Sequence, residues 1–349
     1  MKNDIISPQT TILEALTKMD EIQRKLLFVL EENLFIGVVS IGDLQRAIIN
    51  QFAFDTPIQK ILREIITIAS PKDSFEEIRR VMIEKRTEAM PVVDDKGVLQ
   101  SIVYWEDIIP EETPKKNSSL NIPVVIMAGG FGSRLKPLTN VIPKPLIPIG
   151  ENTIIEEIMN RFVSYGCEKF YVSVNYKAEM IEYYFKNEAK IKYDISYFKE
   201  LKPLGTAGSL HLLNNQFDTT FFVSNCDILV DDDYSEILKY HRENNNELTL
   251  VAALKSYNIP YGTIETAEKG LLNSINEKPN FTFKINAGLY VLEPHLINEI
   301  PKDTFFHITA LIEKLRKENR RVGVFPVSEN SWKDMGEWSE YLKLINEKR

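Results

Sequence analysis

The segment VVIMAGGFGSRLKPLTNVIPKPLIPIG, residues 124–150, combines glycine-rich backbone with fixed positive charge. Its apolar start predicts a buried strand, and Gly129, Gly130 and Gly132 follow at the carboxyl end of that strand. Because glycine has no Cβ, backbone N–H groups in such a loop can approach an anion closely. Arg134 comes next, and Lys144 lies between two prolines that restrict the backbone. The loop is therefore a candidate phosphate-binding site.

Two acidic residues stand at the ends of predicted elements, one after an apolar strand and one before a glycine turn. Asp227 ends the apolar run FFVSNCD, and Asp334 lies just before Gly336. Mg²⁺ takes one or two protein carboxylates together with water and phosphate oxygens, so this pair would suffice if the fold united the two acids. Each acid could instead be an ordinary helix cap or turn residue. The run Asp231 to Asp233 is expected to be a solvated helix start.

The glycine pattern differs from two common nucleotide-binding loops. A dinucleotide fingerprint would need a third glycine at Leu135, and a P-loop would need a closing Gly-Lys-Ser/Thr, which this loop lacks. These differences argue against a nicotinamide-dependent oxidoreductase. A nucleotide-binding regulator without catalysis would be expected to have lost the basic or acidic residues named above, and all of them are present.

The whole chain is acidic, with 349 residues, 44% hydrophobic content and a formal net charge of -8. This length predicts two or three domains, and the charge argues against a nucleic-acid partner. The two cysteines, Cys167 and Cys226, are too few for a disulfide framework. No apolar run approaches the roughly 18 residues of a membrane span, so no membrane partner is expected. A reducing cytoplasm is the expected compartment.

The first 110 residues contain an internal repeat. Pro8 and Pro71 lie 63 positions apart, and Thr11 and Ser74 keep that offset, each with Glu three positions later in a capping-box pattern. Each unit reads as helix, strand, turn, strand and an acidic helix start. We therefore expect a tandem α/β pair over residues 1–112, with repeats of about 1–58 and 59–112.

This pair resembles tandem CBS (Bateman) modules, with Gly37 to Asp43 as the better match and Ser101 to Asp107 as the weaker one. Such pairs often bind adenine nucleotides, so the resemblance implies an effector with the two aspartates on ribose. Tyr104 and Trp105 replace small residues of the family pattern, and both aspartates could simply cap the following helices. An effector sensor and a structural platform both stay open. Paired modules commonly associate, which implies a homodimer.

A polar stretch, PEETPKKNSSLN, follows the repeats and predicts a linker at residues 113–121. Beyond it, apolar strands such as KFYVSVN and LTLVAAL alternate with helical patterns such as TIIEEIMNRFVSYG. This alternation predicts a Rossmann-like α/β domain over residues 122–349 with a mainly parallel, mixed sheet. Ligands are expected at the carboxyl ends of its strands.

Residues 122–338 resemble the sugar-1-phosphate nucleotidyltransferases, whose pattern G-G-x-G-[ST]-R followed by P-K-[PA] matches residues 129–134 and 143–145. The resemblance implies that a sugar 1-phosphate attacks the α-phosphorus of a nucleoside triphosphate and releases pyrophosphate. No general base is needed, because the attacking phosphate oxygen is already ionised near neutral pH. The nucleotide-binding residues that it implies are Ala128, Gly129, Gly130, Gly132, Ser133, Glu200, Gly205 and Thr206.

The same resemblance assigns the charged residues. Arg134 and Lys144 would stabilise the phosphates, Asp227 and Asp334 would hold Mg²⁺, and Lys278 in the segment NEKP would align the attacking phosphate. Removing one such charge is expected to slow turnover on the order of 10²–10³-fold and barely change stability. The implied sugar-binding residues are Gly262, Glu277 and Asn286.

The segment ELKPLGTAG, starting at Glu200, resembles the base-reading segment of mannose-1-phosphate and related guanylyltransferases. A carboxylate only accepts hydrogen bonds, so Glu200 could pair with both the N1–H and N2–H₂ groups of guanine. This favours GTP. Alternatively, Glu200 points to solvent and backbone groups alone read the base.

The fusion of a CBS pair to a guanylyl-type domain resembles bacterial glucosamine-1-phosphate guanylyltransferases of legionaminic acid synthesis. This resemblance implies α-D-glucosamine 1-phosphate as the acceptor and a GDP-sugar as the product. Mannose 1-phosphate and heptose 1-phosphate stay open as acceptors.

Overall fold

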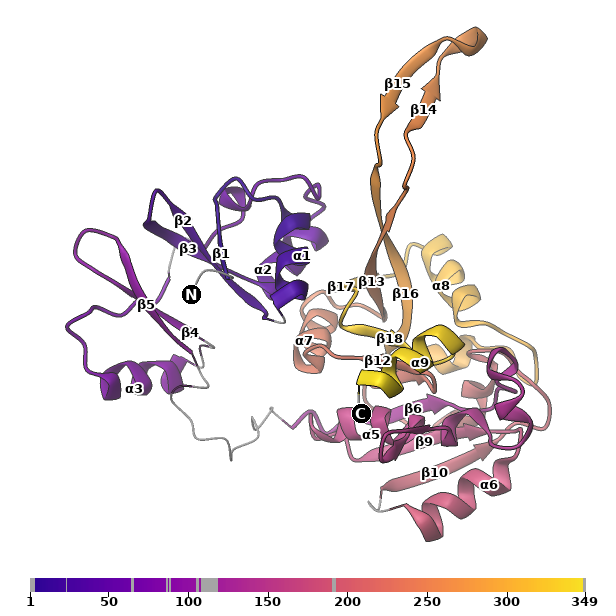
Figure 1. The fold of residues 1–349 in the computed structure, drawn as a ribbon. Coiled ribbons are helices and arrows are strands. Elements are labelled where there is room, and N and C mark those ends of the chain that lie inside the picture. Colours follow the sequence, from indigo (N-terminus) through magenta and orange to yellow (C-terminus); the bar gives the residue numbers. More distant parts are fainter. Residues whose placement is uncertain are drawn as a thin grey trace. The chain divides into compact units, whose positions relative to one another are not determined.

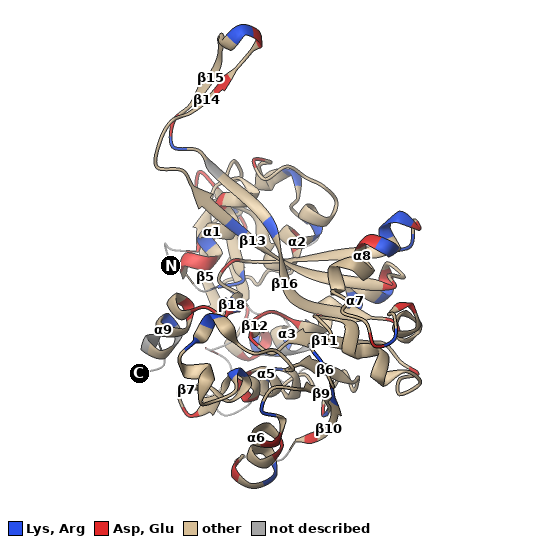
Figure 2. Cartoon of the chain, turned by 90° about the vertical axis from the view of Figure 1, so that its right-hand side faces the viewer, with Lys and Arg blue, Asp and Glu red and all other residues tan. Residues whose placement is uncertain are grey.

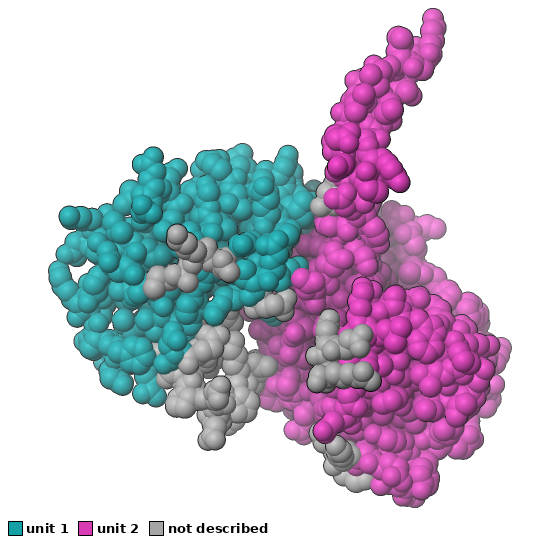
Figure 3. Space-filling view, in the orientation of Figure 1, with its two compact units in different colours: residues 1–116 teal, residues 117–349 magenta. Residues whose placement is uncertain are grey.

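The computed structural model describes residues 4–22, 24–63, 66–85, 87, 89–104, 107, 119–189 and 193–347. The chain forms two compact units, residues 1–116 and 117–349 (Figures 1 and 3). Most of the predicted linker, residues 113–121, lies outside the described residues, as does Trp105.

The first unit repeats one arrangement. Its elements are β1 (Ile5–Ile6), α1 (Ile12–Ile22), β2 (Leu26–Glu31), β3 (Leu34–Ser40), α2 (Ile41–Ile49), α3 (Phe75–Lys85), β4 (Ala89–Val93) and β5 (Leu99–Tyr104). β1 is parallel to β2 with Ile6 opposite Val29, and Ala69 makes a parallel bridge to Val92. Both members of these pairs differ by 63 positions, so the sequence repeat corresponds to a structural one.

Capping boxes begin the first helix of each repeat, as predicted. Glu14 accepts hydrogen bonds from the N–H group and the hydroxyl of Thr11, at 2.8 and 2.9 Å. Glu77 accepts the equivalent bonds from Ser74, at 2.8 and 2.7 Å. These bonds satisfy N–H groups that have no partner within the helix and fix where each helix begins.

Asp43 forms a third capping box, at the start of α2. Its carboxylate accepts the backbone N–H of Ser40 at 2.9 Å and forms ion pairs with Arg46 at 2.5 Å and Arg63 at 2.6 Å. Burial acts to raise the pKa of this carboxyl, but the Arg63 and Ser40 hydrogen bonds outweigh burial and lower the pKa. The structure thus gives Asp43 the helix-cap role that the sequence left open. Asp107 likewise accepts the N–H of Tyr104, at 2.8 Å.

Tyr104 links the two repeats. Its hydroxyl donates to Asp4, its ring meets Phe28 edge-on at 6.4 Å between centroids, and the Arg24 guanidinium lies 4.1 Å from its ring centroid. Burial, and then the Asp4 carboxylate, raise the pKa of the phenol. The aromatic side chain that departs from the family pattern therefore takes part in packing between the repeats.

A seven-stranded sheet organises the second unit, in the order β10-β9-β6-β11-β16-β13-β17. Its strands are β6 (Val124–Met127), β9 (Lys169–Val174), β10 (Asp194–Lys199), β11 (Phe221–Asn225), β13 (Leu248–Asn258), β16 (Asn280–Leu292) and β17 (Val322–Val327). Neighbours are parallel except on the two sides of β16. This confirms the predicted α/β class with a mainly parallel, mixed sheet.

Helices cover both faces of this sheet. The α-helices that the structure describes in this unit are α5 (Ile154–Val163), α6 (Ala178–Tyr183), α7 (Tyr234–Glu243), α8 (Ile308–Lys317) and α9 (Trp338–Glu347). Val124 and Ile126 of β6 pack into the same core cluster as α5 and α7, whereas Val125 packs into the cluster that contains α8 residues. Alternate residues of a strand point to opposite faces, so β6 is buried on both sides and its sequence is continuously apolar. Of the helices that the structure describes, none has the length and apolar character to span a bilayer.

The acidic run before α7 is only partly solvated. Asp233 caps the helix by accepting the N–H of Ser235 at 2.8 Å, and Asp231 pairs with Arg161 at 2.6 Å. Asp232 is buried. The expectation of a solvated run was therefore wrong at Asp232, which packs against Arg161 and Tyr165 as both donate hydrogen bonds to its carbonyl.

Strands β13 and β16 continue beyond the sheet as a two-stranded ribbon. Their pairing extends to Asn258 opposite Asn280, and a hairpin of β14 (Thr263–Thr266) and β15 (Leu272–Asn276) follows. Figures 1 and 2 show this hairpin projecting away from the sheet. Large apolar side chains along the ribbon and hairpin are exposed: Tyr257, Tyr261, Ile264, Leu271, Leu272, Ile275, Phe281 and Phe283.

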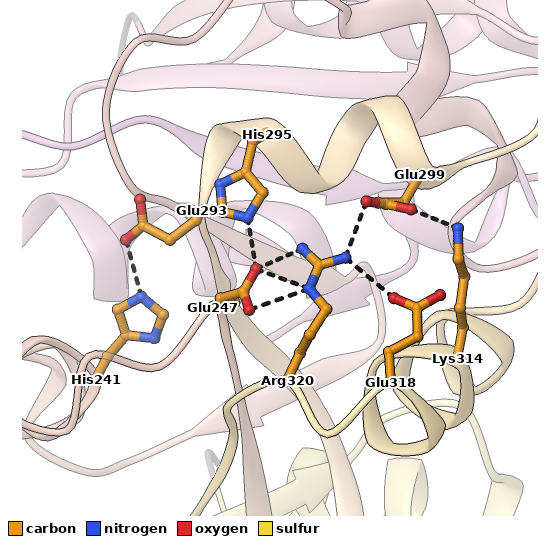
Figure 4. Close-up of polar contacts among 8 residues, drawn as sticks. All are labelled: His241, Glu247, Glu293, His295, Glu299, Lys314, Glu318 and Arg320. Atoms are coloured by element: carbon orange, nitrogen blue, oxygen red, sulfur yellow. Dashed lines mark hydrogen bonds and ion pairs between the residues drawn. The ribbon is translucent and has the colours of Figure 1, made fainter.

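A polar network joins the residue before β13 to the segments on either side of α8 (Figure 4). Arg320 donates to Glu247 at 3.1 Å and to Glu299 at 2.9 Å, and His295 lies 2.6 Å from Glu247. The Arg320 hydrogen bond is the main reason that the pKa of Glu247 is lowered, to about 2. Glu247 stays ionised over the range in which most proteins are studied.

A neighbouring histidine, His241 of α7, is buried between Thr249 and Glu293, and Figure 4 shows it beside Glu293. Its ring nitrogens are 2.8 Å from the Thr249 hydroxyl and 3.1 Å from the Glu293 carboxylate. Burial disfavours the imidazolium more than Glu293 favours it, so the pKa of His241 is lowered.

We expect the free energy of unfolding to decrease as pH falls from 7 to 5. An unfolded histidine takes up its proton near pH 6.5, whereas folded His241 takes it up at lower pH, so protons favour the unfolded chain in this window. The contribution of Glu247 is lost only below its unfolded pKa of about 4.3. Urea unfolding at the two pH values measures the decrease, and His241→Gln should reduce it while His307→Gln, at an exposed position, should not. Equal pH dependence in the parent and His241→Gln would contradict this assignment.

Candidate functional site

The glycine-rich loop leaves β6 at the carboxyl end of the sheet, beside the end of β11. Met127 is paired with Asn225 in the parallel register, so the loop and Asp227 emerge side by side. Gly132 has φ +64°, and a Cβ built there would lie 2.9 Å from the Cβ of Lys144. The Thr139 hydroxyl donates to the Gly132 carbonyl at 2.9 Å. Glycine is required here by both the backbone conformation and the close approach of the lysine segment.

A cavity of about 360 Å³ opens above this loop. Seven of the eight predicted nucleotide-binding residues line it; the eighth, Ala128, is buried beneath the loop. Arg134, Lys144 and Asp227 line it as well. The full lining is Met127, Gly129, Gly130, Phe131, Gly132, Ser133, Arg134, Lys144, Glu200, Pro203, Leu204, Gly205, Thr206, Asn225, Cys226, Asp227, Phe305 and His307.

Two cations, one buried and one half exposed, converge on Asp227. Lys144 is buried, and its ammonium forms an ion pair with the Asp227 carboxylate. The Arg134 guanidinium lies 3.5 Å from the same carboxylate and is half exposed. A buried ammonium with one carboxylate partner is held in place and can act on a bound phosphate without reorganising.

The structure brings Asp334 to Asp227. β12 (Ile228–Val230) pairs antiparallel with β18 (Trp332–Asp334), placing Ile228 opposite Asp334, and the Met335 N–H donates to the Asp227 carbonyl at 2.8 Å. A Cβ built on Gly336 would lie 2.5 Å from the Lys144 ammonium, 2.7 Å from the Asp227 carboxylate and 2.9 Å from the Asp334 carboxylate. All three charged groups therefore surround Gly336. Because glycine has no Cβ, they can approach one another there.

These two carboxylates fit Mg²⁺ in type and number, since that ion is commonly held by one or two carboxylates and completes its shell with water and phosphate oxygens. Burial, and then the charge of Asp227, raise the pKa of Asp334, while the Gly336 N–H and the two cations oppose this shift. A divalent cation would relieve the repulsion between the two acids. Within the part of the chain that the structure describes, no group of three or more His, Cys, Asp or Glu has a metal-holding arrangement.

Glu200 faces the cavity. Glu200 is 4% exposed, so it does not point to bulk solvent as the alternative expected. One oxygen accepts the Ser173 hydroxyl and the other accepts the Leu204 N–H at 3.1 Å. A Cβ built on Gly129 would lie 2.6 Å from the Glu200 carboxylate, so the loop glycine admits the acid.

The LGTAG segment packs on a second loop that the sequence analysis did not single out. Gly205 has φ +81°, and a Cβ there would meet the Phe306 carbonyl at 2.7 Å. The Thr206 hydroxyl accepts the Ile308 N–H at 3.1 Å and lies 3.3 Å from the His307 ring. Phe305 and His307 thereby reach the cavity. No local sequence pattern identified Phe305 and His307 as site residues, because the loop that carries them is positioned at the cavity by the tertiary contact of Phe306 with Gly205.

The predicted sugar-side residues lie apart from the cavity. Gly262 and Glu277 come together at the base of the projecting hairpin, where a Cβ on Gly262 would lie 2.8 Å from the Glu277 carboxylate. Lys278 is exposed beside them with φ +46°. None of the three is in the cavity lining. Asn286 accepts the Gly288 N–H at 3.1 Å, and Gly288 approaches the cavity residue Asn225.

A second cavity, of about 510 Å³, lies against the other side of the carboxylate site. Its lining includes Asp334 and Glu337 together with Trp332, Lys333 and Lys255. The Lys255 ammonium lies 5.6 Å from the Trp332 ring centroid. The wall at Asp334 and Glu337 contacts Arg134 of the first cavity.

Comparisons with known proteins match both units. Residues 3–50 and 58–111 match the CBS domain model, and residues 123–349 match the nucleotidyl transferase model. The chain is 33% identical over 233 residues to a mannose-1-phosphate guanyltransferase of Yarrowia lipolytica, covering 62% of this chain and 61% of the relative. It is 30% identical over 241 residues to a UTP–glucose-1-phosphate uridylyltransferase of Synechocystis, covering 63% of this chain and 62% of that protein. It thus spans about three fifths of the length of these relatives.

Among solved structures, HddC of Yersinia pseudotuberculosis superposes with a TM-score of 0.51 at 26% identity, covering 65% of this chain and 100% of that one. The family model extends from the strand before the glycine-rich loop through Asp227 to Asp334 and α9. Because this match covers well over half of the sequence, the chain belongs to the nucleotidyl transferase family.

Proposed function

We propose that this protein transfers a guanylyl group from GTP to a sugar 1-phosphate and releases pyrophosphate. The observation that carries the proposal is the convergence of Lys144, Arg134 and two carboxylates beside a glycine-rich loop at one end of the sheet. This combination suits a triphosphate whose α-phosphorus is attacked, since charge must be stabilised on both the transferring and leaving groups.

The residues divide this work by position. Backbone N–H groups of the glycine loop would bind the phosphates, and Lys144 and Arg134 would stabilise charge as pyrophosphate leaves. Asp227 and Asp334 would hold Mg²⁺, which when bound neutralises phosphate charge. Lys144 already lies between the loop and Asp227, so its ammonium is oriented before substrate arrives.

Glu200 supports guanine as the base. Its carboxylate lies in the cavity wall, and each oxygen retains acceptor capacity beyond its internal hydrogen bond. Guanine offers two adjacent donors to such a group. UTP is the competing nucleotide, because one relative is named a uridylyltransferase.

Two acceptors are proposed. Mannose 1-phosphate is supported by the name of the Yarrowia lipolytica relative, and α-D-glucosamine 1-phosphate by the order of a CBS pair before the transferase domain. The acceptor would approach from the second cavity, which borders Asp334 and is lined by three lysines and four acidic residues. Lys278, Glu277 and Gly262 are in the lining of neither cavity.

The test is pyrophosphate release with Mg²⁺, with GTP, ATP, UTP, CTP and dTTP each crossed against glucosamine, mannose, glucose and heptose 1-phosphates. Release with GTP and one acceptor supports the proposal and names the sugar. Release only with another nucleotide would reject guanine, and no release with any pair would reject the activity.

For the first unit we propose an adenine-nucleotide effector and a homodimer as separate hypotheses. The CBS match supports nucleotide binding, whereas the ion pairs of Asp43 mean that a ribose would have to displace Arg46 or Arg63. Thermal unfolding with AMP or ATP tests the effector, and sedimentation tests the dimer. No change in unfolding temperature with either nucleotide would leave a structural role for the pair.

A further inference from the structure

Arg134 of the glycine-rich loop has a partner that no sequence motif indicates. Its guanidinium lies 2.7 Å from the carboxylate of Glu337, closer than to Asp227 at 3.5 Å or Asp334 at 3.7 Å. Glu337 stands between β18 and α9, far along the chain from the loop. The hydrogen bond from Arg134 to Glu337 is the main cause of the raised pKa of Arg134.

The two side chains face different cavities. Arg134 lines the cavity above the glycine-rich loop, whereas Glu337 lines the second cavity and not the first. The guanidinium thus lies between the expected phosphate site and a carboxylate. About half of each side chain is exposed, 53% for Arg134 and 47% for Glu337. Such a pair exchanges readily, because water and salt screen it and it contributes little to stability.

We propose that Glu337 is a positioning residue. Before substrate binds it holds the Arg134 guanidinium, and it competes with the substrate phosphates for that guanidinium. The inference rests on the proposed function, in which the loop binds a triphosphate. A carboxylate and a phosphate oxygen both accept hydrogen bonds from a guanidinium. When phosphate arrives, Arg134 exchanges Glu337 for it; when pyrophosphate leaves, Glu337 recovers the guanidinium.

A purely structural role for Glu337 makes a different prediction. Glu337 precedes α9, and its carbonyl accepts the Tyr341 N–H at 2.9 Å. A carboxylate near a helix N-terminus stabilises the helix. Neutralising the Glu337 carboxylate would then destabilise the start of α9. The affinity for pyrophosphate would decrease or stay the same. Competition instead predicts tighter binding of polyphosphate.

The experiment is calorimetric titration of the full chain with inorganic pyrophosphate in the presence of Mg²⁺. Glu337→Gln keeps the size of the side chain and removes its charge, and it should lower the Kd for pyrophosphate roughly two- to fivefold, the equivalent of one exposed ion pair. The KM for the nucleoside triphosphate should fall by a similar factor, without a matching rise in kcat. An unchanged or raised Kd overturns the inference.

Two further variants make the result specific. Glu313→Gln breaks an exposed ion pair with Arg316 on α8, at 2.9 Å and with similar exposure, and it should leave the Kd unchanged. In an Arg134→Gln background, Glu337→Gln should no longer lower the Kd for pyrophosphate. If it still lowered the Kd, the effect would come from the overall charge of the protein, and the role assigned to Arg134 would be wrong. If the parent chain binds no pyrophosphate, the proposed function fails as well, whereas binding by the parent without tightening in Glu337→Gln removes only the inference.

Discussion

Replacing Asp227 with asparagine is expected to slow pyrophosphate release on the order of 10²–10³-fold. The substitution preserves shape but removes the charge that would hold a divalent cation and that orients Lys144. The rate is measured with Mg²⁺, GTP and the acceptor that the substrate screen identifies. Asp231→Asn is the control, because this neighbouring acid pairs with Arg161 and is outside both cavity linings. A rate for Asp227→Asn within a few-fold of the parent would exclude the proposed carboxylate site.

The same variant should also lose stability, contrary to the expectation that loss of one site charge barely matters. Both partners are buried, so Asp227→Asn leaves the Lys144 ammonium without a charged partner. A buried polar group left unsatisfied costs about 1–3 kcal/mol, and more when it is charged. Asp227→Asn with Lys144→Met removes both charges and should recover stability but not activity. Urea unfolding and turnover of the three proteins separate the two roles; recovery of turnover in the double variant would contradict the mechanism.

The strands and loops of the site could be predicted because their signals are local. Val124 to Met127 is an apolar run before glycines, and the structure places a strand there with the loop at its carboxyl end. The repeat in the first unit was also predictable. Each capping box spans only four residues, and the same pattern recurs 63 positions later in the sequence. Such features depend on neighbouring residues and not on the tertiary fold.

The proximity of Asp227 and Asp334 could be expected only from the family resemblance and not from the sequence pattern itself. It depends on the short pairing of β12 with β18, whose residues carry no pattern that identifies their partner. The same limit explains the missed loop at Phe305 and His307, and the missed contact of Arg134 with Glu337. The projecting hairpin was not predicted either, since large apolar residues such as Ile264 and Ile275 are usually buried and here are exposed.

The second large effect is expected at Glu200. Glu200→Gln should lower kcat/KM for GTP on the order of 10²-fold, because hydrogen bonds to a charged group contribute about 1.5–3 kcal/mol. An amide presents one acceptor and one donor, so its NH₂ group would face a guanine donor. Uracil carries adjacent donor and acceptor groups, so kcat/KM for UTP should rise relative to that for GTP. The measurement is kcat/KM for both nucleotides with the same acceptor.

The control for this prediction comes from the internal partners of Glu200. Its oxygens already accept the Ser173 hydroxyl and the Leu204 N–H, so Glu200 could serve only to fix the loop that begins at Leu204. In that case Glu200→Gln would lower kcat/KM for GTP and UTP equally. Ser173→Ala keeps the carboxylate and removes one internal donor, and should therefore affect both nucleotides alike. A change in the GTP-to-UTP ratio in Glu200→Gln, but not in Ser173→Ala, would assign base recognition to the carboxylate itself; an equal loss for both nucleotides would leave Glu200 a structural role.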